Sequence, residues 1–140
     1  MRGFLVDTNC ISELVRVQPE PRVVDWIQSI DEELIYLSVL TLGEIRKGLQ
    51  SLRANKRRSG LETWLVDLKL RFAGRILPID EAVAEQWGLL AAQSKREGKP
   101  LAIIDGLLIA TALSRNLTIA TRNTADFAFG QVSVFNPWVH

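Results

Sequence analysis

Four acidic residues occupy positions at which α/β proteins commonly place chemistry. Asp7 follows the apolar run 3–6, Glu44 lies six residues past the run 34–38, Asp126 lies five residues past the run 117–121, and Asp105 lies within the apolar segment 101–113. In open α/β sheets, sites form at the carboxyl ends of the strands. Each acid stands near a point where a strand would pass into a helix, so we expect the four carboxylates to converge on one end of a sheet.

Clustered carboxylates predict a bound divalent cation. Several carboxylates brought together repel one another and raise each other's pKa unless a cation lies among them. The sequence offers no Cys or His cluster, so the ligands would all be oxygen atoms, which favours Mg²⁺ or Mn²⁺ over zinc. Ions held in this way bind phosphate oxygens and lower the pKa of a water. The acids therefore predict phosphoryl or phosphodiester chemistry.

Each acid also has a purely structural explanation. Asp7 could cap a following helix, Glu44 could complete a capping box with Thr41, Asp105 could be an N-cap, and the segment 123–126 could be a capped turn. For any acid taken alone, capping is the more frequent role. Asp105 differs because its neighbours are Ile103, Ile104, Leu107 and Leu108. They predict a buried place, where an unpartnered carboxylate would be costly by several kcal/mol.

Other catalytic chemistries lack the residues they need. The only histidine is His140, at the end of the chain, so a Ser-His-Asp or Cys-His arrangement has no base. Cys10 is more simply explained as a small buried residue. Neither G-x-x-x-x-G-K-[ST] nor G-x-G-x-x-G is present, and Asn9 stands where a D-x-D phosphatase needs its second acid. A water activated by metal remains as the nucleophile.

Alternating patterns predict the elements that would position these acids. Strands are expected at 3–6, 34–38, 77–79, 117–121 and, at an edge, 132–135, and helices at 23–30, 42–52, 61–72, 82–97 and 105–114, with an irregular segment at 51–60. Strands that alternate with helices indicate an α/β fold with a mostly parallel sheet covered on both faces. No linker or repeat divides the chain, so we expect a single domain, residues 1–140.

Composition sets the class of protein. The chain has 140 residues, 47% of them hydrophobic and 24% charged, with a net charge of +1 and one cysteine. This is a globular composition. The beginning lacks the apolar core of a signal peptide, and the run 101–113 is too short for a bilayer, so we expect a cytoplasmic protein with no membrane partner. Trp26, Trp64, Trp87 and Trp138 are expected in the core.

At these residues the sequence resembles the PIN-domain ribonucleases of the VapC type, toxins of type II toxin–antitoxin pairs. Five motifs carry the resemblance, in order along nearly the whole chain: L-V-D-T-N-C-I-S-E-L, L-S-V-L-T-L-G-E-I-R-K-G, I-I-D-G-L-L-I-A-T-A-L, T-R-N-T-A-D-F and a closing N-P-W, the last as in the FitB-like branch. Two departures, Cys10 and Gly106, replace an aliphatic residue and alanine, and neither lies at a ligand position.

The resemblance implies a fold, an activity and roles for residues. The fold would be a PIN-like three-layer α/β/α sandwich, and the activity Mg²⁺- or Mn²⁺-dependent cleavage of single-stranded or loop RNA. Asp7, Glu44 and Asp105 match the core metal ligands, and Asp126 matches an assisting acid. The polar positions Thr8 and Asn9 match a pair that orients the first acid, and Thr121 and Asn123 match residues that line the pocket.

The resemblance also implies partners. Members commonly form homodimers and are inhibited by a small cognate antitoxin of the VapB type. That antitoxin folds onto the groove of the toxin, often places an arginine in the acidic pocket, and as a complex, sometimes a higher assembly, binds operator DNA. Contact with DNA would therefore come only through the antitoxin.

The hypothesis from sequence is a metal-dependent ribonuclease, with two alternatives. Arg46, Lys47 and Arg122 would position substrate phosphates, although solvated surface explains them equally well. The basic segment between Glu44 and Glu62 has the same two interpretations. One alternative is a non-catalytic acidic pocket that docks a basic segment of a partner. The other is a metal-dependent phosphatase acting on small substrates.

Overall fold

The computed structural model describes residues 3–139. Its centre is a five-stranded parallel sheet. The strands are β1 (Phe4–Val6), β2 (Ile35–Ser38), β3 (Ile76–Leu77), β4 (Thr118–Ala120) and β5 (Val134–Phe135), in the order β3-β2-β1-β4-β5. All neighbouring strands are parallel. All five predicted strands are present, but β3 begins one residue early and omits residues 78–79, and β5 begins two residues later than predicted. Strand β5 lies at an edge, as expected.

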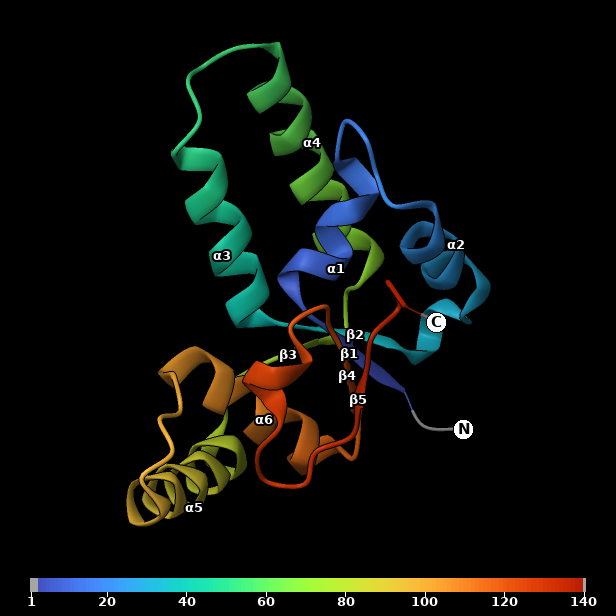
Figure 1. Cartoon of the computed structure of the whole chain (residues 1–140). Helices are drawn as coiled ribbons and strands as arrows, with labels where there is room; N and C mark the ends of the chain where they lie inside the picture. Colours follow the sequence, from blue (N-terminus) through green and yellow to red (C-terminus); the bar gives the residue numbers. More distant parts are fainter. Residues whose placement is uncertain (1–2, 140) are drawn as a thin grey trace.

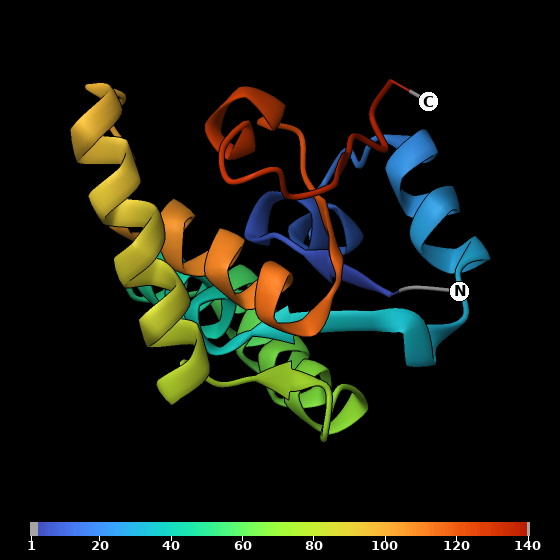
Figure 2. The ribbon, with the colours of Figure 1, turned by 90° about the horizontal axis from the view of Figure 1, so that it is seen from below.

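Helices cover both faces of this sheet. They are α1 (Thr8–Ser12), α2 (Pro21–Ser29), α3 (Val39–Gln50), α4 (Lys56–Arg71), α5 (Glu81–Glu97) and α6 (Ile103–Arg115), with 3-10 turns at Glu13–Val15, Glu32–Leu34 and Thr124–Phe127. Figure 1 shows α1–α4 on one side of the strands and α5 and α6 on the other. The last two helices pack side by side (Figure 2). The predicted three-layer arrangement is confirmed.

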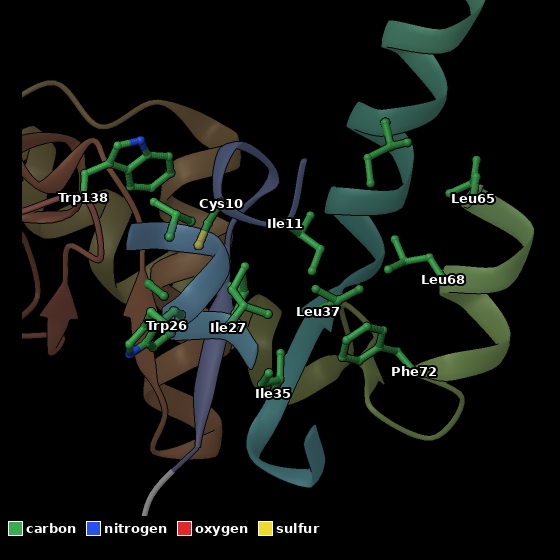
Figure 3. Packing of buried hydrophobic residues seen from close by; sticks show 14 of the residues in the cluster. Cys10, Ile11, Trp26, Ile27, Ile35, Leu37, Leu65, Leu68, Phe72 and Trp138 are labelled. Carbon is green, nitrogen blue, oxygen red and sulfur yellow. The ribbon is translucent and has the colours of Figure 1, made fainter. Parts of the chain in front are cut away.

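The alternation of strand side chains divides the core into two clusters. Val6 points into the cluster beneath α2, α3 and α4, whereas its neighbour Leu5 points into the cluster beneath α5 and α6. Both side chains are almost fully buried. In the first cluster, shown in Figure 3, Leu68 of α4 and Phe72, which follows this helix, lie beside the strand residue Leu37. Burial on both faces fixes the sheet between its helices.

All four tryptophans contribute to these clusters. Trp26 and Trp138 are buried, and Trp64 and Trp87 are half-buried against the two clusters. The ring of Trp26 packs against Phe4 with centroids 5.0 Å apart in an edge-to-face arrangement. The prediction that the tryptophans are core residues is confirmed.

All five predicted helices begin earlier than their apolar stripes indicated, and the shift is largest for two of them. Helix α3 begins at Val39, not at residue 42, because the hydroxyl of Ser38 accepts a hydrogen bond from the Leu40 N–H and caps the helix directly after β2. Helix α4 begins at Lys56, where Asn55 accepts from the Arg58 N–H at 2.9 Å. The segment 51–60, expected to be irregular, is therefore helical in its second half.

No helix within residues 3–139 is both long enough and apolar enough to cross a membrane.

Candidate active site

A cavity of about 660 Å³ lies at the carboxyl edge of the sheet, and all four predicted acids line it. Parallel strands end at a common edge, so the segments that follow β1, β2 and β4 meet there. Helix α6 enters the same place from the other face of the sheet. The lining consists of Asp7, Thr8, Asn9, Val39, Leu40, Gly43, Glu44, Lys47, Gly48, Ser51, Ile104, Asp105, Leu108, Asn123, Asp126 and Phe127.

Asp7 is the most buried of the acids, with 7% of its surface exposed. It follows β1 and caps α1, since its Oδ1 accepts from the Cys10 N–H at 3.0 Å. Its Oδ2 accepts a hydrogen bond from the hydroxyl of Thr121 at the end of β4. Burial raises the pKa of Asp7 above its ordinary value, and repulsion from Glu44 and Asp105 raises it further, while the two hydrogen bonds act in the opposite direction. Asp7 is thus both a cap and a member of the acid cluster.

Glu44 is the sixth residue of α3, in the second turn and not the first. The capping box considered for it is wrong, because Ser38 and not Thr41 caps this helix. The Glu44 Oε1 accepts a hydrogen bond of 2.6 Å from the hydroxyl of Thr8. No capping role accounts for Glu44, and its carboxylate is fixed to the segment that carries Asp7.

Asp105 is the third residue of α6, whose N-cap is Ala102, so the N-cap role is wrong for Asp105. The argument from its apolar neighbours also needs correction, because Ile103 is 66% exposed and Ile104 is 41% exposed. Asp105 lies half-buried at the rim of the cavity. Burial raises its pKa, and repulsion from Asp126 and Glu44 adds to that shift. Asp105 is thus characterised by partial burial at the rim of the cavity together with its proximity to the other acids, and not by enclosure in an apolar segment.

Asp126 lies in the 3-10 turn Thr124–Phe127 and is exposed. Its backbone N–H donates to the Asn123 carbonyl at 3.1 Å, but no side-chain hydrogen bond caps this turn. The carboxylate faces the cavity and repels Asp105. Its exposure agrees with an assisting role at the open side of the site.

The remaining predicted site residues divide into three groups. Thr8, Asn9, Lys47 and Asn123 line the cavity, and Thr121 reaches it through its bond to Asp7. Arg46 does not enter, because its guanidinium pairs with Glu62 at 2.6 Å. Arg122 lies in an adjoining cavity, with its guanidinium 5.6 Å from the centre of the Trp138 ring.

One wall of the cavity was not predicted. Gly43, Gly48 and Ser51 line it from α3, and a Cβ on either glycine would meet only open space. Together with Glu44 and Lys47 they form one helix face, opposite the apolar stripe that packs on the core. The spacing of small and polar residues along this helix is the sequence feature from which this wall could have been predicted.

The donors of the site suit a hard divalent cation. The acid side chains provide only oxygen atoms. Burial, and then repulsion between the acids, raises the pKa of Asp7 and Asp105, and a bound cation would offset both effects. Within the described chain, no three Asp, Glu, His or Cys side chains are arranged so that they could hold a metal as they stand. The donor chemistry suits a hard divalent cation, but the carboxylates are held too far apart to bind one together as they stand.

Cys10 takes no part in this chemistry. Its side chain is fully buried beneath α1 (Figure 3). Burial raises the pKa of its thiol far above the ordinary value, and the neighbouring Asp7 and Glu13 add to the shift. A thiol in that state is a poor nucleophile.

Comparisons with known proteins agree with this geometry. The family model of the PIN domain matches residues 4–132. The chain is 45% identical to Toxin FitB of Neisseria gonorrhoeae, covering 96% of this chain and 98% of the toxin. It is 38% identical to VapC ribonuclease Y4jK of Sinorhizobium fredii, covering 96% and 97%.

A solved structure shares the whole architecture. FitAcB from Neisseria gonorrhoeae superposes with a TM-score of 0.92 at 43% identity, covering 98% of this chain and 99% of that one. FitAB bound to an IR36 DNA fragment superposes with a TM-score of 0.91 at 43% identity, covering 98% and 96%. With a family model that spans most of its length and close relatives over almost all of it, this chain belongs to the PIN-domain family, in the group that includes the FitB and VapC proteins.

Proposed function

We propose that this chain is the toxin of a toxin–antitoxin pair and a metal-dependent ribonuclease that hydrolyses RNA phosphodiester bonds. The observation that carries the proposal is the convergence of Asp7, Glu44, Asp105 and Asp126 on one open cavity, although the first and the last lie 119 positions apart along the chain. The names of the similar proteins, a toxin and a ribonuclease, support it.

The four acids would hold one or two divalent cations, Mg²⁺ or Mn²⁺. Such a cation neutralises charge on a phosphate and lowers the pKa of a water. The hydroxyls of Thr8 and Thr121 fix the directions of Glu44 and Asp7 by hydrogen bonds. To bind one ion together, the acids would have to move closer to one another. Lys47 is the cationic side chain among those that line the cavity, and we assign it to a substrate phosphate.

The partners follow from the same family. We propose a cognate antitoxin of the VapB type that covers the cavity, contact with operator DNA through that antitoxin, and a homodimer of this chain. The FitAB assembly on a DNA fragment supports this arrangement. We further propose a cytoplasmic location and a single domain over residues 1–140, which agrees with one continuous sheet and the absence of a membrane-crossing helix in residues 3–139.

Substitution of Asp105 by Asn tests the activity. The change preserves shape and removes one charge from the cluster, so we expect cleavage of labelled RNA in Mg²⁺ to fall by at least about a hundredfold while the circular dichroism spectrum stays the same. EDTA should stop RNA cleavage by the wild-type protein, and Mg²⁺ added in excess should restore that cleavage.

A matched control is Asp67→Asn, because Asp67 is exposed on α4 and does not line the cavity. That variant should cut RNA at the wild-type rate. If Asp105→Asn also cut RNA at the wild-type rate, or if the wild type cut equally well in EDTA, the proposal would be wrong. Binding of a basic peptide without any cleavage would instead indicate a docking pocket.

A further inference from the structure

We propose that a second cavity, beside the acid cluster, is the subsite for an RNA phosphate next to the scissile one, and that Arg122 is its anchor. This inference rests on the proposed ribonuclease function and goes beyond it by assigning a path to the strand. The second cavity has a volume of about 480 Å³. Asn9 and Asn123 line both cavities, so the two adjoin each other.

Arg122 carries the charge that this second cavity presents. Within residues 3–139 its side chain forms no ion pair, although Arg16 in the same cavity is paired with Glu13 at 2.9 Å. The other oxygen of Glu13 accepts from the Glu20 N–H at 2.8 Å. Because the Glu13 and Arg16 charges offset one another, Arg122 gives the side chains that line this cavity a net positive charge. Glu20, outside this lining, interacts with Arg122 but forms its ion pair with Arg22 at 2.8 Å.

An aromatic ring, and no ion pair within residues 3–139, holds the Arg122 side chain in place. Its guanidinium lies 5.6 Å from the centre of the Trp138 ring, within the range of a cation–π contact. Trp138 is itself fixed, since it is 7% exposed and its backbone N–H donates to the Asn136 side-chain oxygen at 2.8 Å. The closing N-P-W turn therefore acts as a support that positions a guanidinium, and guanidinium groups bind phosphate oxygens strongly.

The two cavities together define a direction for the substrate. A phosphate cannot rest on the acids without a cation, but a neighbouring phosphate of the same strand can rest on Arg122. Contacts to phosphate position a nucleic acid without reading its sequence. Arg122 should therefore raise affinity for single-stranded RNA of any sequence, with its effect mainly on binding.

The test measures binding and its salt dependence. The background is the full-length Asp105→Asn protein in Mg²⁺, where labelled single-stranded RNAs of several sequences can be followed by fluorescence anisotropy without being cut. Arg122→Gln should weaken binding about tenfold for every sequence. The slope of log Kd against log salt should fall by about 0.7, the value for one phosphate contact on a single strand.

Two further variants separate charge from packing. Arg122→Lys keeps the charge and should retain the wild-type salt slope. Arg96→Ala removes an exposed arginine of α5 that lines neither cavity and should change nothing. In the active protein, Arg122→Gln should raise KM while kcat changes little.

The subsite would be excluded if Arg122→Gln kept the wild-type RNA affinity and salt slope, or if Arg122→Lys lost that salt slope. It would also be excluded if Arg122→Gln weakened binding of only one RNA sequence. These outcomes are distinct from failure of the proposed function. A wild-type protein that cuts no RNA would disprove the ribonuclease, whereas the anisotropy series reports on Arg122 in a variant that is not meant to cut.

Discussion

The acid cluster stores electrostatic repulsion in the folded chain, and this repulsion has a predictable dependence on pH. Asp7 and Asp105 both have a folded-state pKa raised above the ordinary value of 3.8. A carboxyl whose pKa is raised by folding contributes stability that is present below the unfolded-state pKa and is lost as the pH rises through the folded-state pKa. In metal-free protein, the ionised cluster therefore opposes folding near neutral pH.

Asp105→Asn should remove part of the destabilisation that the ionised acids cause near neutral pH. In EDTA, we expect the difference in Tm between the variant and the wild type to be close to zero near about pH 4 and to grow in favour of the variant toward about pH 7. Thermal unfolding followed by circular dichroism measures it, with Asp67→Asn as the control that should show no such trend. A difference that is constant with pH, or that favours the wild type, would contradict the repulsion.

Single residues also show where interpretation of the sequence reached its limit. Asp7, Glu44 and Asp126 were identified from the sequence because each follows a predicted strand. Asp105 lies in a helix that follows another helix, α5, and it was identified from its place in an apolar segment. Arg46 was associated with substrate because it lies close to Glu44, but it pairs with Glu62 sixteen positions away. Such a pair depends on how α3 packs against α4, and helical spacing within one element does not contain that information.

At the scale of elements, helix starts were the weakest part of the prediction. The apolar stripe of α3 begins at Leu42, yet the helix begins at Val39, because the capping hydroxyl lies on the last residue of β2. This shift moves Glu44 into the second turn, where it reaches the Thr8 hydroxyl. Periodicity locates the buried face of a helix, but caps decide where it begins.

The cap of α3 makes its own prediction. Ser38 is fully buried and its hydroxyl accepts from the Leu40 N–H at 3.0 Å. Ser38→Ala should lower the free energy of unfolding by about 1 kcal/mol, the usual effect of losing an N-cap. Urea denaturation measures it, and Ser133→Ala, at an exposed site without a recorded side-chain bond, is the control. Equal stability of the two variants would show that the cap is not needed.

Gly106 illustrates packing between two elements. The sequence departs here from the alanine that is frequent in the family, and the structure gives a reason. A Cβ at this position would lie 3.1 Å from the Trp87 ring and 3.2 Å from the Leu101 side chain. The bulky indole of α5 thus occupies the space that a methyl group on α6 would need, and this compensation across two helices is not visible from either segment alone.

For the whole molecule, the sequence predicted the strands and their parallel direction but did not establish their order. The order β3-β2-β1-β4-β5 places β1 at the centre, between the two strands whose following segments carry Glu44 and Asp126. Asp7 therefore lies in the middle of the cluster, which explains why it is the most buried of the four acids. Long-range strand pairing determines this order, and short motifs do not encode it.

The same architecture predicts that a divalent cation stabilises the whole fold. Asp7 comes from the first strand, Glu44 from one helical layer and Asp105 from the other, so an ion held by all three would link the sheet to both layers. A ligand that binds only the folded chain adds stability of about 2.7 kcal/mol when present at a hundred times its Kd. We therefore expect Mg²⁺ to raise the Tm of the wild type in the absence of RNA.

Differential scanning fluorimetry at increasing Mg²⁺ concentrations measures this stabilisation, with Ca²⁺ and Na⁺ at equal ionic strength as comparison salts. The rise in Tm should be strongly reduced in Asp105→Asn and in Glu44→Gln, and unchanged in Asp67→Asn. Because repulsion is relieved only when the acids are ionised, the effect of Mg²⁺ should grow between about pH 5 and pH 7. An equal rise in Tm for the wild type and the cavity variants would mean that the ion acts elsewhere, and that the four carboxylates do not form one site.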